Sequence, residues 1–278
     1  MNTTLAHTIV GGSFLDKNKK TIFILHGILV NKDNWSSFCQ EIVNKYPNWQ
    51  VVAIDLRAHG DSPSFNPPHN LASCAQDVIN LSEKLGVTPD VVVGHSFGGK
   101  VALAYLDACR QQNRPTPKDT WVLEALPGCG EIPIVTDYIL PTLLSLPVPI
   151  ASKREFVALL ESKGFETRQA QWMTTNLKSL ENDPEQFEWK MNLAVIQVMF
   201  QAFLATDCWP ILYDPPLNTS IHIVQAEYNQ LWTEEILTRF RQLPTRDRVH
   251  LHLLEKSDHW VHIDNPNGLF AMMEKSLQ

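Results

Sequence analysis

The sequence predicts a doubly wound, mostly parallel α/β sheet. Short apolar runs that suit buried strands alternate along the chain with segments of helical spacing, which is the pattern of βαβ units. One run, Val91–Val93, passes through Gly94 straight into a segment whose apolar residues have helical spacing. Such a strand–turn–helix junction is typical of the carboxyl edge of a parallel sheet.

The expected elements follow one another in a regular order. A first strand is expected near the start of the chain, and Asn70 and Gly86 are suited to cap a helix over residues 71–85 at its two ends. Further helices are expected after residue 98, between the last two strands and at the end of the chain. The remaining strands are expected within residues 21–27, 49–55, 89–96, 120–128, 220–227 and 249–255.

The length of 278 residues fits one α/β domain that carries an insertion. Strand signals vanish between Gly130 and Pro216, where the pattern is helical and rich in aromatic residues and methionine. We therefore expect a helical lid over residues 130–216, inserted after the sixth strand, between two parts of the core at residues 1–129 and 217–278.

Composition narrows the class of partner. With 23 basic and 30 acidic residues the net charge is −7, which argues against nucleic acid or an anionic membrane and favours a small-molecule substrate. The five cysteines are scattered and show no metal-ligand spacing, so we expect neither a metal nor a cofactor. Without a signal-like start or an apolar run long enough to span a bilayer, a cytoplasmic protein with no stable membrane insertion is expected. The oligomeric state stays open.

A serine lies at the predicted strand-to-helix turn. Gly94-His95-Ser96-Phe97-Gly98 has the GxSxG spacing of a nucleophile elbow, in which the glycines make room where strand and helix nearly meet. Ser96 is therefore the candidate nucleophile. The N–H groups of Ile28, in the loop after residues 21–25, and of Phe97 are the candidate oxyanion-hole donors.

A serine hydroxyl needs an imidazole to accept its proton and a carboxylate to orient that imidazole. Among the ten histidines, His259 is the candidate base because it lies in the turn after the last strand. The expected place for the acid, after residues 220–226, holds Glu227 and Asn229, whereas Glu124 ends the strand beside the nucleophile strand. We expect Glu124 to be the acid, with Glu227, Asn229 or no acid as the alternatives.

The lid residues together indicate an apolar pocket, although packing of the lid on the body would explain any single one. Arg57, with Asp55 and Asp61 nearby, is expected to bind loop carbonyls or a carboxylate beneath the site. The candidate pocket residues are His26, His95, Trp172, Met173, Phe200 and Trp260.

These motifs resemble the α/β-hydrolase superfamily, and within it the branch around alpha/beta hydrolase domain-containing protein 11 and its bacterial and plant relatives. The resemblance rests on the loop at residues 26–29, the segments 55–62, 94–100 and 258–266, and the lid segments 174–177 and 189–193. It implies a serine esterase or thioesterase with a Ser-acid-His triad, and it supports the roles given to Ser96, His259, Ile28 and Phe97. In that branch an aspartate commonly stands where this chain has Glu124, and a second carboxylate falls where it has Ala194.

The expected function is hydrolysis of a carboxylic ester or thioester of an apolar acyl group through an acyl-serine. Two alternatives remain: an acyltransferase that passes the acyl group to an alcohol on the same triad, and a lid-gated small-molecule receptor with vestigial hydrolysis. A serine nucleophile argues against dehalogenation, which uses an aspartate in distant relatives.

Overall fold

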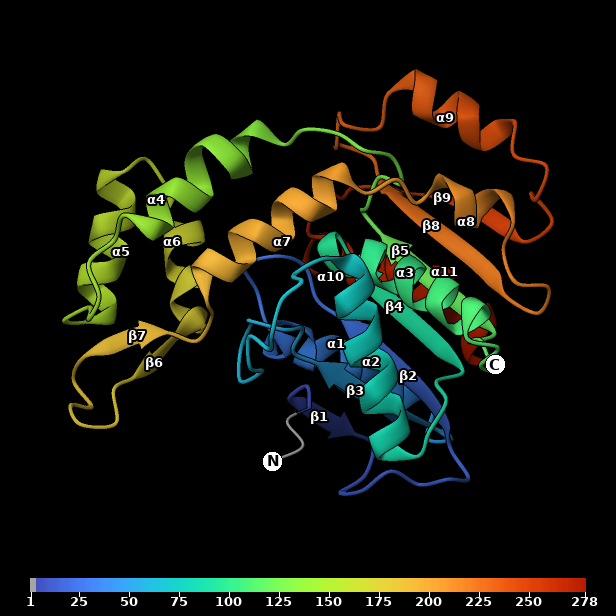
Figure 1. Cartoon of the computed structure of the whole chain (residues 1–278), viewed down its shortest axis with the longest axis horizontal. Coiled ribbons are helices and arrows are strands. Elements are labelled where there is room, and N and C mark those ends of the chain that lie inside the picture. Colours follow the sequence, from blue (N-terminus) through green and yellow to red (C-terminus); the bar gives the residue numbers. More distant parts are fainter. Residues whose placement is uncertain (1–3) are drawn as a thin grey trace.

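A twisted, mostly parallel sheet forms the centre of the protein (Figure 1). The structure, a computed structural model, describes residues 4–278; residues 1–3 of the predicted core segment lie outside the described residues. Over that range the main sheet has seven strands in the order β1-β3-β2-β4-β5-β8-β9. Strand β1 pairs with β3 in the antiparallel direction and every other pair is parallel. The predicted mostly parallel α/β sheet is confirmed.

The strands of the main sheet lie close to the expected positions. Their bounds are β1 (His7–Val10), β2 (Lys20–Leu25), β3 (Trp49–Ile54), β4 (Val91–His95), β5 (Asp119–Leu123), β8 (Ser220–Ala226) and β9 (Val249–Leu254). The helices of the body are η1 (Lys32–Trp35), α1 (Ser36–Lys45), α2 (Leu71–Leu85), α3 (Phe97–Gln111), α9 (Glu234–Arg241), α10 (Val261–Asp264) and α11 (Pro266–Leu277).

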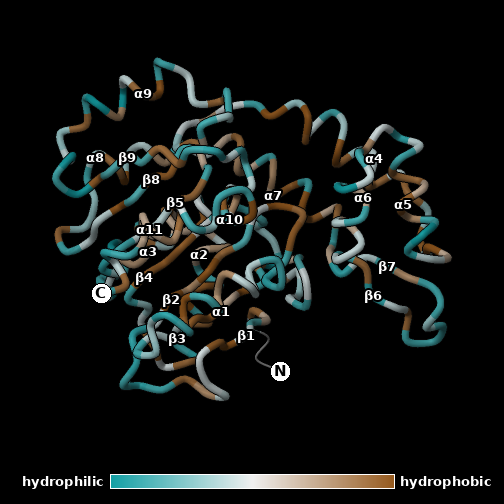
Figure 2. Tube along the Cα trace, turned by 180° about the vertical axis from the view of Figure 1, so that it is seen from behind, coloured by the Kyte–Doolittle hydropathy of each residue, from teal (hydrophilic) through white to brown (hydrophobic). Residues whose placement is uncertain are grey.

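Helices cover both faces of the sheet because the buried strands carry apolar side chains on both sides. Phe23 and Val92 pack with residues of α2 and α3, whereas their neighbours Ile24 and Val93 point to the other face and pack with α1 and α11. Figure 2 shows the hydrophobic residues concentrated on the central strands. The chain is therefore doubly wound, as predicted.

Helix α2 has the predicted bounds and both predicted caps. The Asn70 side chain accepts a hydrogen bond from the Ser73 N–H (2.9 Å), and Gly86 ends the helix in the left-handed region at φ 63°. These interactions lie within one helical turn of each end, which is why the local sequence predicts them.

A long segment between β5 and β8 lies to one side of the sheet, and helix α7 leads from it back to the body (Figure 1). We call residues 130–216 the inserted segment. Its elements are η2 (Ile134–Ile139), α4 (Leu140–Leu144), α5 (Lys153–Ser162), α6 (Thr167–Met173), η3 (Thr174–Asn176), β6 (Leu177–Ser179), β7 (Phe187–Trp189), α7 (Leu193–Ala205) and α8 (Trp209–Tyr213). Whether it works as a lid stays a prediction.

Two details of the expected insertion are wrong. It follows β5, which is the fifth strand in chain order and not the sixth. It also contains an antiparallel hairpin of β6 and β7. Each of these strands has three residues, too few for the alternation of apolar and polar side chains that marks a strand in a sequence.

Between residues 4 and 278, no helix is both long enough and apolar enough to cross a bilayer.

Candidate active site

The backbone around Ser96 turns sharply between β4 and α3. Ser96 has φ 52° and ψ −115°, and its N–H donates to the carbonyl of Leu123 on β5 (2.8 Å). A Cβ on Gly94 would lie 2.1 Å from the carbonyl oxygen of Gly98, and one on Gly98 would lie 2.3 Å from the carbonyl oxygen of Leu25. Both glycines are therefore required by close backbone approach, which is the reason predicted from the sequence.

The loop after β2 passes directly beside this turn. A Cβ on Gly27 would lie 3.0 Å from His95 Nδ1 and 3.5 Å from the Ser96 Cβ, so the loop approaches the turn within van der Waals contact. The Phe97 N–H is at the first position of α3, where no intrahelical acceptor exists. Among the described residues, no hydrogen bond uses the Ile28 N–H. Phe97 thus follows Ser96 directly, and Ile28 lies in the neighbouring loop and lines the same cavity as Ser96.

Glu124 lies immediately after β5 with its carboxylate buried. The residue has φ 51°, and its N–H continues the β5–β8 pairing by donating to the Val224 carbonyl (2.9 Å). One carboxylate oxygen accepts from the Ala226 N–H and from Trp232 Nε1 (2.9 Å). The backbone therefore aims this side chain across the end of β8, toward the loop that carries His259.

The second oxygen of Glu124 faces the candidate base. Glu124 Oε2 lies 3.5 Å from His259 Nδ1 and also accepts a hydrogen bond from Asn229 Nδ2. The alternative acid, Glu227, instead accepts the Lys256 N–H (2.7 Å). Of the two carboxylates, Glu124 is thus the one that contacts His259, and Asn229 is a partner of that carboxylate.

His259 is held by its backbone as well as by Glu124. The His95 Nε2–H donates to the His259 carbonyl (2.7 Å), and the His259 N–H donates to the Asp258 carboxylate (2.8 Å). Within residues 4–278, no hydrogen bond joins the Ser96 hydroxyl to the His259 ring, although both side chains line one cavity. The structure therefore brings the serine, histidine and glutamate to one place.

The shared cavity has a volume of about 490 Å³ and lies between the sheet edge and the inserted segment. Five of the six predicted pocket residues line it: His95, Trp172, Met173, Phe200 and Trp260. Sequence reasoning missed a group of apolar residues at the start of the inserted segment, although the apolar run from residue 138 was a signal for the later ones. These residues are Ile132, Ile134, Val135, Tyr138 and Ile139.

His26 was expected in the pocket, and this expectation is wrong. Its ring is wholly buried beneath the loop, where Nε2 accepts the Leu56 N–H (2.9 Å) and Nδ1–H donates to the Gly27 carbonyl (2.7 Å). Burial is the main cause that lowers the pKa of His26 to about 4, so the ring is neutral and fixes the loop.

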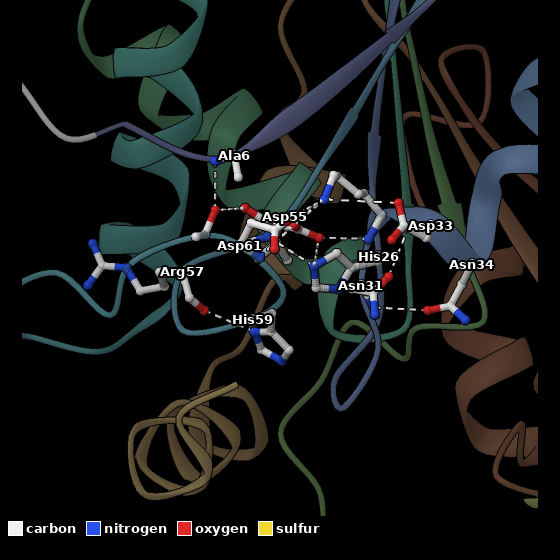
Figure 3. A network of polar contacts seen from close by, with 12 residues as sticks. Ala6, His26, Asn31, Asp33, Asn34, Asp55, Arg57, His59 and Asp61 are labelled. Atoms are coloured by element: carbon white, nitrogen blue, oxygen red, sulfur yellow. Dashed lines mark hydrogen bonds and ion pairs between the residues drawn. The ribbon is translucent and has the colours of Figure 1, made fainter. Parts of the chain in front are cut away.

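The charged residues of segment 55–62 have the predicted structural role (Figure 3). Asp55 accepts from the Lys32 ammonium (2.8 Å), the Lys32 N–H (2.8 Å) and the Asp61 N–H (2.9 Å). Arg57 binds the carboxylate of Asp77 (2.6 Å) and the carbonyl of Pro68 (2.9 Å). These contacts support the loop beneath the cavity. Neither Asp55 nor Arg57 lines the cavity.

Two further buried histidines lie behind His259. The His262 ring stacks on Trp35 with 3.9 Å between ring centroids, and neither of its nitrogens has a partner among the described residues. Burial lowers the pKa of His262 to about 3, and the proximity of His259 makes a smaller contribution in the same direction. Burial also lowers the pKa of His95 well below its usual value. Both rings are therefore neutral around the candidate base.

Comparison with known proteins gives matches along the whole chain. A family model described as "Alpha/beta hydrolase family" matches residues 22–272. The mouse protein named sn-1-specific diacylglycerol lipase ABHD11 is 25% identical over 268 residues, covering 94% of this chain and 81% of that protein. Esterase YbfF of Escherichia coli is 22% identical over 271 residues, covering 94% of each chain. The solved structure of a marine microorganism esterase has a TM-score of 0.82 at 20% identity and covers 99% of both chains.

The state of His262 predicts how stability depends on pH. An unfolded histidine binds a proton below about pH 6.5, whereas the folded one does so only near pH 3, so stability is lost as the pH falls between these values. His262→Phe keeps the stacking on Trp35 and removes the titration. We expect urea unfolding to show the variant within about 1 kcal/mol of wild type at pH 7 and about 2 kcal/mol more stable than wild type at pH 5. Parallel pH curves for the two proteins would contradict this expectation.

Proposed function

The chain belongs to the alpha/beta hydrolase family and is related to ABHD11 within it. We propose that it is a carboxylic ester hydrolase that forms an acyl intermediate on Ser96. The observation that carries the proposal is the Glu124–His259 contact of 3.5 Å at a cavity that Ser96 also lines. The names of the mouse and E. coli relatives, a diacylglycerol lipase and an esterase, support ester hydrolysis.

In the proposed first step, Ser96 Oγ attacks the carbonyl carbon of an ester or thioester while His259 Nε2 accepts the hydroxyl proton. Glu124 faces Nδ1, so it favours the tautomer that leaves Nε2 free to accept, and it stabilises the imidazolium. The oxygen of the substrate carbonyl becomes negative and is stabilised by the Ile28 and Phe97 N–H groups, each worth about 2.7–4 kcal/mol in comparable enzymes. His259 then donates its proton to the departing alcohol or thiol.

The second half of the reaction repeats this chemistry with water. His259 takes a proton from a water molecule, the resulting hydroxide attacks the acyl-serine carbonyl, and the same two N–H groups stabilise the second oxyanion. The proton returns to Ser96 Oγ as the carboxylic acid leaves. Neutral His95 supports both halves because its Nε2–H holds the backbone of His259 in place.

The acyl group is proposed to lie under the inserted segment, which would then act as a lid over residues 130–216. The part of the cavity wall that this segment supplies is mostly apolar, with Phe165, Trp172, Met173 and Phe200 among its residues. No lysine or arginine is among the described lining residues, and Asp258 adds a negative charge. A neutral, apolar acyl group therefore suits the wall better than an anionic one.

Covalent labelling tests the nucleophile. A fluorophosphonate should add one phosphonyl group to the wild-type protein, because the activated hydroxyl attacks phosphorus as it attacks a carbonyl. Intact-mass analysis should show this adduct in wild type and none in Ser96→Ala. Labelling that persists in Ser96→Ala would remove Ser96 from the role.

Charge substitution tests the acid. Glu124→Gln should lower kcat for p-nitrophenyl butyrate by up to about 10⁴-fold, as loss of the triad acid does in serine proteases. Glu124→Asp should retain partial activity because the charge stays but is withdrawn by one methylene. Glu227→Gln is the matched control, and its kcat should stay within about threefold of wild type because Glu227 contacts the Lys256 backbone instead.

The neighbouring amide allows a sharper form of this test. In Glu124→Gln/Asn229→Asp the carboxylate and the amide exchange places within the same pair, so a negative charge again lies near His259. We expect the double variant to recover at least tenfold in kcat over Glu124→Gln alone. A larger loss in Glu227→Gln than in Glu124→Gln would instead assign the acid to β8.

Acyl length tests the pocket. Each methylene buried against the apolar wall contributes about 0.8 kcal/mol, which is about fourfold in kcat/KM. Activity on p-nitrophenyl esters should therefore rise from acetate through butyrate to hexanoate. A monosuccinate ester, which carries a carboxylate on an acyl chain of butyrate length, should react more slowly than the butyrate. Preference for the monosuccinate would contradict an apolar acyl site.

A further inference from the structure

We propose that Asn176, in the inserted segment, is a positioning residue for the oxyanion hole. The Asn176 Nδ2–H donates to the carbonyl of Leu29 (2.9 Å), the residue next to Ile28. The inference rests on the proposed function, because it concerns the N–H of Ile28 that stabilises the oxyanion there. It makes the hole depend on a side chain from the segment that covers the cavity.

Leu29 has a backbone conformation that needs support. Its φ of 60° is in the left-handed region, which is unfavourable for a leucine and persists where the surroundings fix it. The carbonyl is held by Asn176, and the N–H donates to His59 Nε2 (3.3 Å). Both backbone polar groups of Leu29 are therefore held by side chains distant in sequence, and together they fix the turn that presents the Ile28 N–H.

The two contacts come from different parts of the fold. His59 belongs to the body, where its Nδ1–H donates to the Arg57 carbonyl (2.9 Å) and leaves Nε2 as the acceptor for Leu29. Asn176 lies in η3 of the inserted segment and is wholly buried. The contact to the carbonyl of Leu29 thus exists only while the inserted segment is seated on the body.

A chain of amides fixes the orientation of Asn176. The Asn31 side-chain oxygen accepts the Asp33 N–H (3.0 Å), so its Nδ2–H points the other way and donates to Asn176 Oδ1 (3.1 Å). Asn176 must then turn Nδ2 toward Leu29. An aspartate of the same shape would place an oxygen against the Leu29 carbonyl and repel it, so the site requires an amide.

Loss of this contact should affect the transition state more than the bound substrate. The Ile28 N–H gains its full value only when negative charge develops on the substrate oxygen. Release of Leu29 should therefore lower kcat and leave KM nearly unchanged. A residue that merely supported the fold would not separate the two constants in this way.

The test uses Asn176→Asp with Asn192→Asp as its matched control. Asn192 is a second asparagine of the inserted segment whose Nδ2 contacts the body, at Ser64 Oγ (3.1 Å), and its oxygen caps α7. An aspartate at 192 keeps that cap and does not touch Leu29. For p-nitrophenyl butyrate we expect kcat to fall about 10- to 100-fold in Asn176→Asp with KM within threefold, and both constants to stay within threefold in Asn192→Asp.

A pair of inhibitors provides the second readout. An alkyl trifluoromethyl ketone forms a hemiketal with the serine and places a negative oxygen in the hole, whereas the matching methyl ketone binds as the neutral carbonyl. In Asn176→Asp the inhibition constant of the trifluoromethyl ketone should rise by the factor by which kcat falls. The methyl ketone should bind as in wild type. If Asn176→Asp does not fold, Asn31→Asp carries the same test, since it frees the Asn176 amide, and a smaller drop of about 3- to 10-fold in kcat is expected.

The outcomes separate the two proposals. In one outcome, wild type hydrolyses the ester and is labelled at Ser96, but folded Asn176→Asp, or Asn31→Asp in its place, has the same ratio of trifluoromethyl-ketone to methyl-ketone inhibition constants as Asn192→Asp. The role of Asn176 is then overturned and the proposed function stands. If wild type neither hydrolyses the ester nor takes up the phosphonate, the proposed function fails and this inference fails with it.

Discussion

The rest of the structure depends on how closely the start of α3 approaches the ends of β2 and β4. A Cβ at Gly94 or Gly98 would lie closer to a backbone oxygen than the ordinary contact distance by more than 1 Å. This approach therefore exists only with glycine at both positions. The approach forces Ser96 into a positive φ and lifts it out of the sheet edge. It also places the N-terminus of α3 against the loop of Gly27 and Ile28, where a negative oxygen would be favoured.

Around the Glu124 carboxylate, buried polar groups are matched to one another. Glu124 has a fully buried carboxylate, and such a charge is tolerated only where donors surround it. The donors come from the Ala226 N–H, Asn229 and Trp232, and His259 takes the remaining direction. An aspartate at 229 would put a second negative charge against Glu124, so the asparagine found there suits a buried carboxylate at Glu124.

The inserted segment is tied to α3, the helix that follows Ser96. The Lys100 ammonium, buried on α3, donates to the carbonyls of Gly128 (2.8 Å), Phe203 (2.9 Å) and Thr206 (2.8 Å). Gly128 lies at the entry to the segment, and the other two lie where α7 returns to the body. Together with Asn176 at the loop of Leu29, these contacts bind the segment to both sides of the serine. The cavity wall and the junction at Ser96 are therefore held by one set of polar contacts.

The sequence by itself determined those features whose causes lie within a few residues. Local sterics and local hydrogen bonds set the strand at residues 91–93, the GxSxG turn and the caps of α2. The fold class, the position of Ser96 in the turn and the loop of Ile28 could therefore be predicted. The hairpin of β6 and β7 escaped prediction because strands of three residues show no periodicity.

Only the tertiary structure decided which carboxylate contacts His259, that His26 is buried away from the cavity, that Asn229 binds Glu124, and that Asn176 binds the carbonyl of Leu29. Along the chain, 105 residues separate Glu124 from Asn229 and 147 separate Leu29 from Asn176. Whether such side chains meet depends on the register of β5 with β8 and on where the inserted segment seats, and neither is encoded within a short window of the sequence.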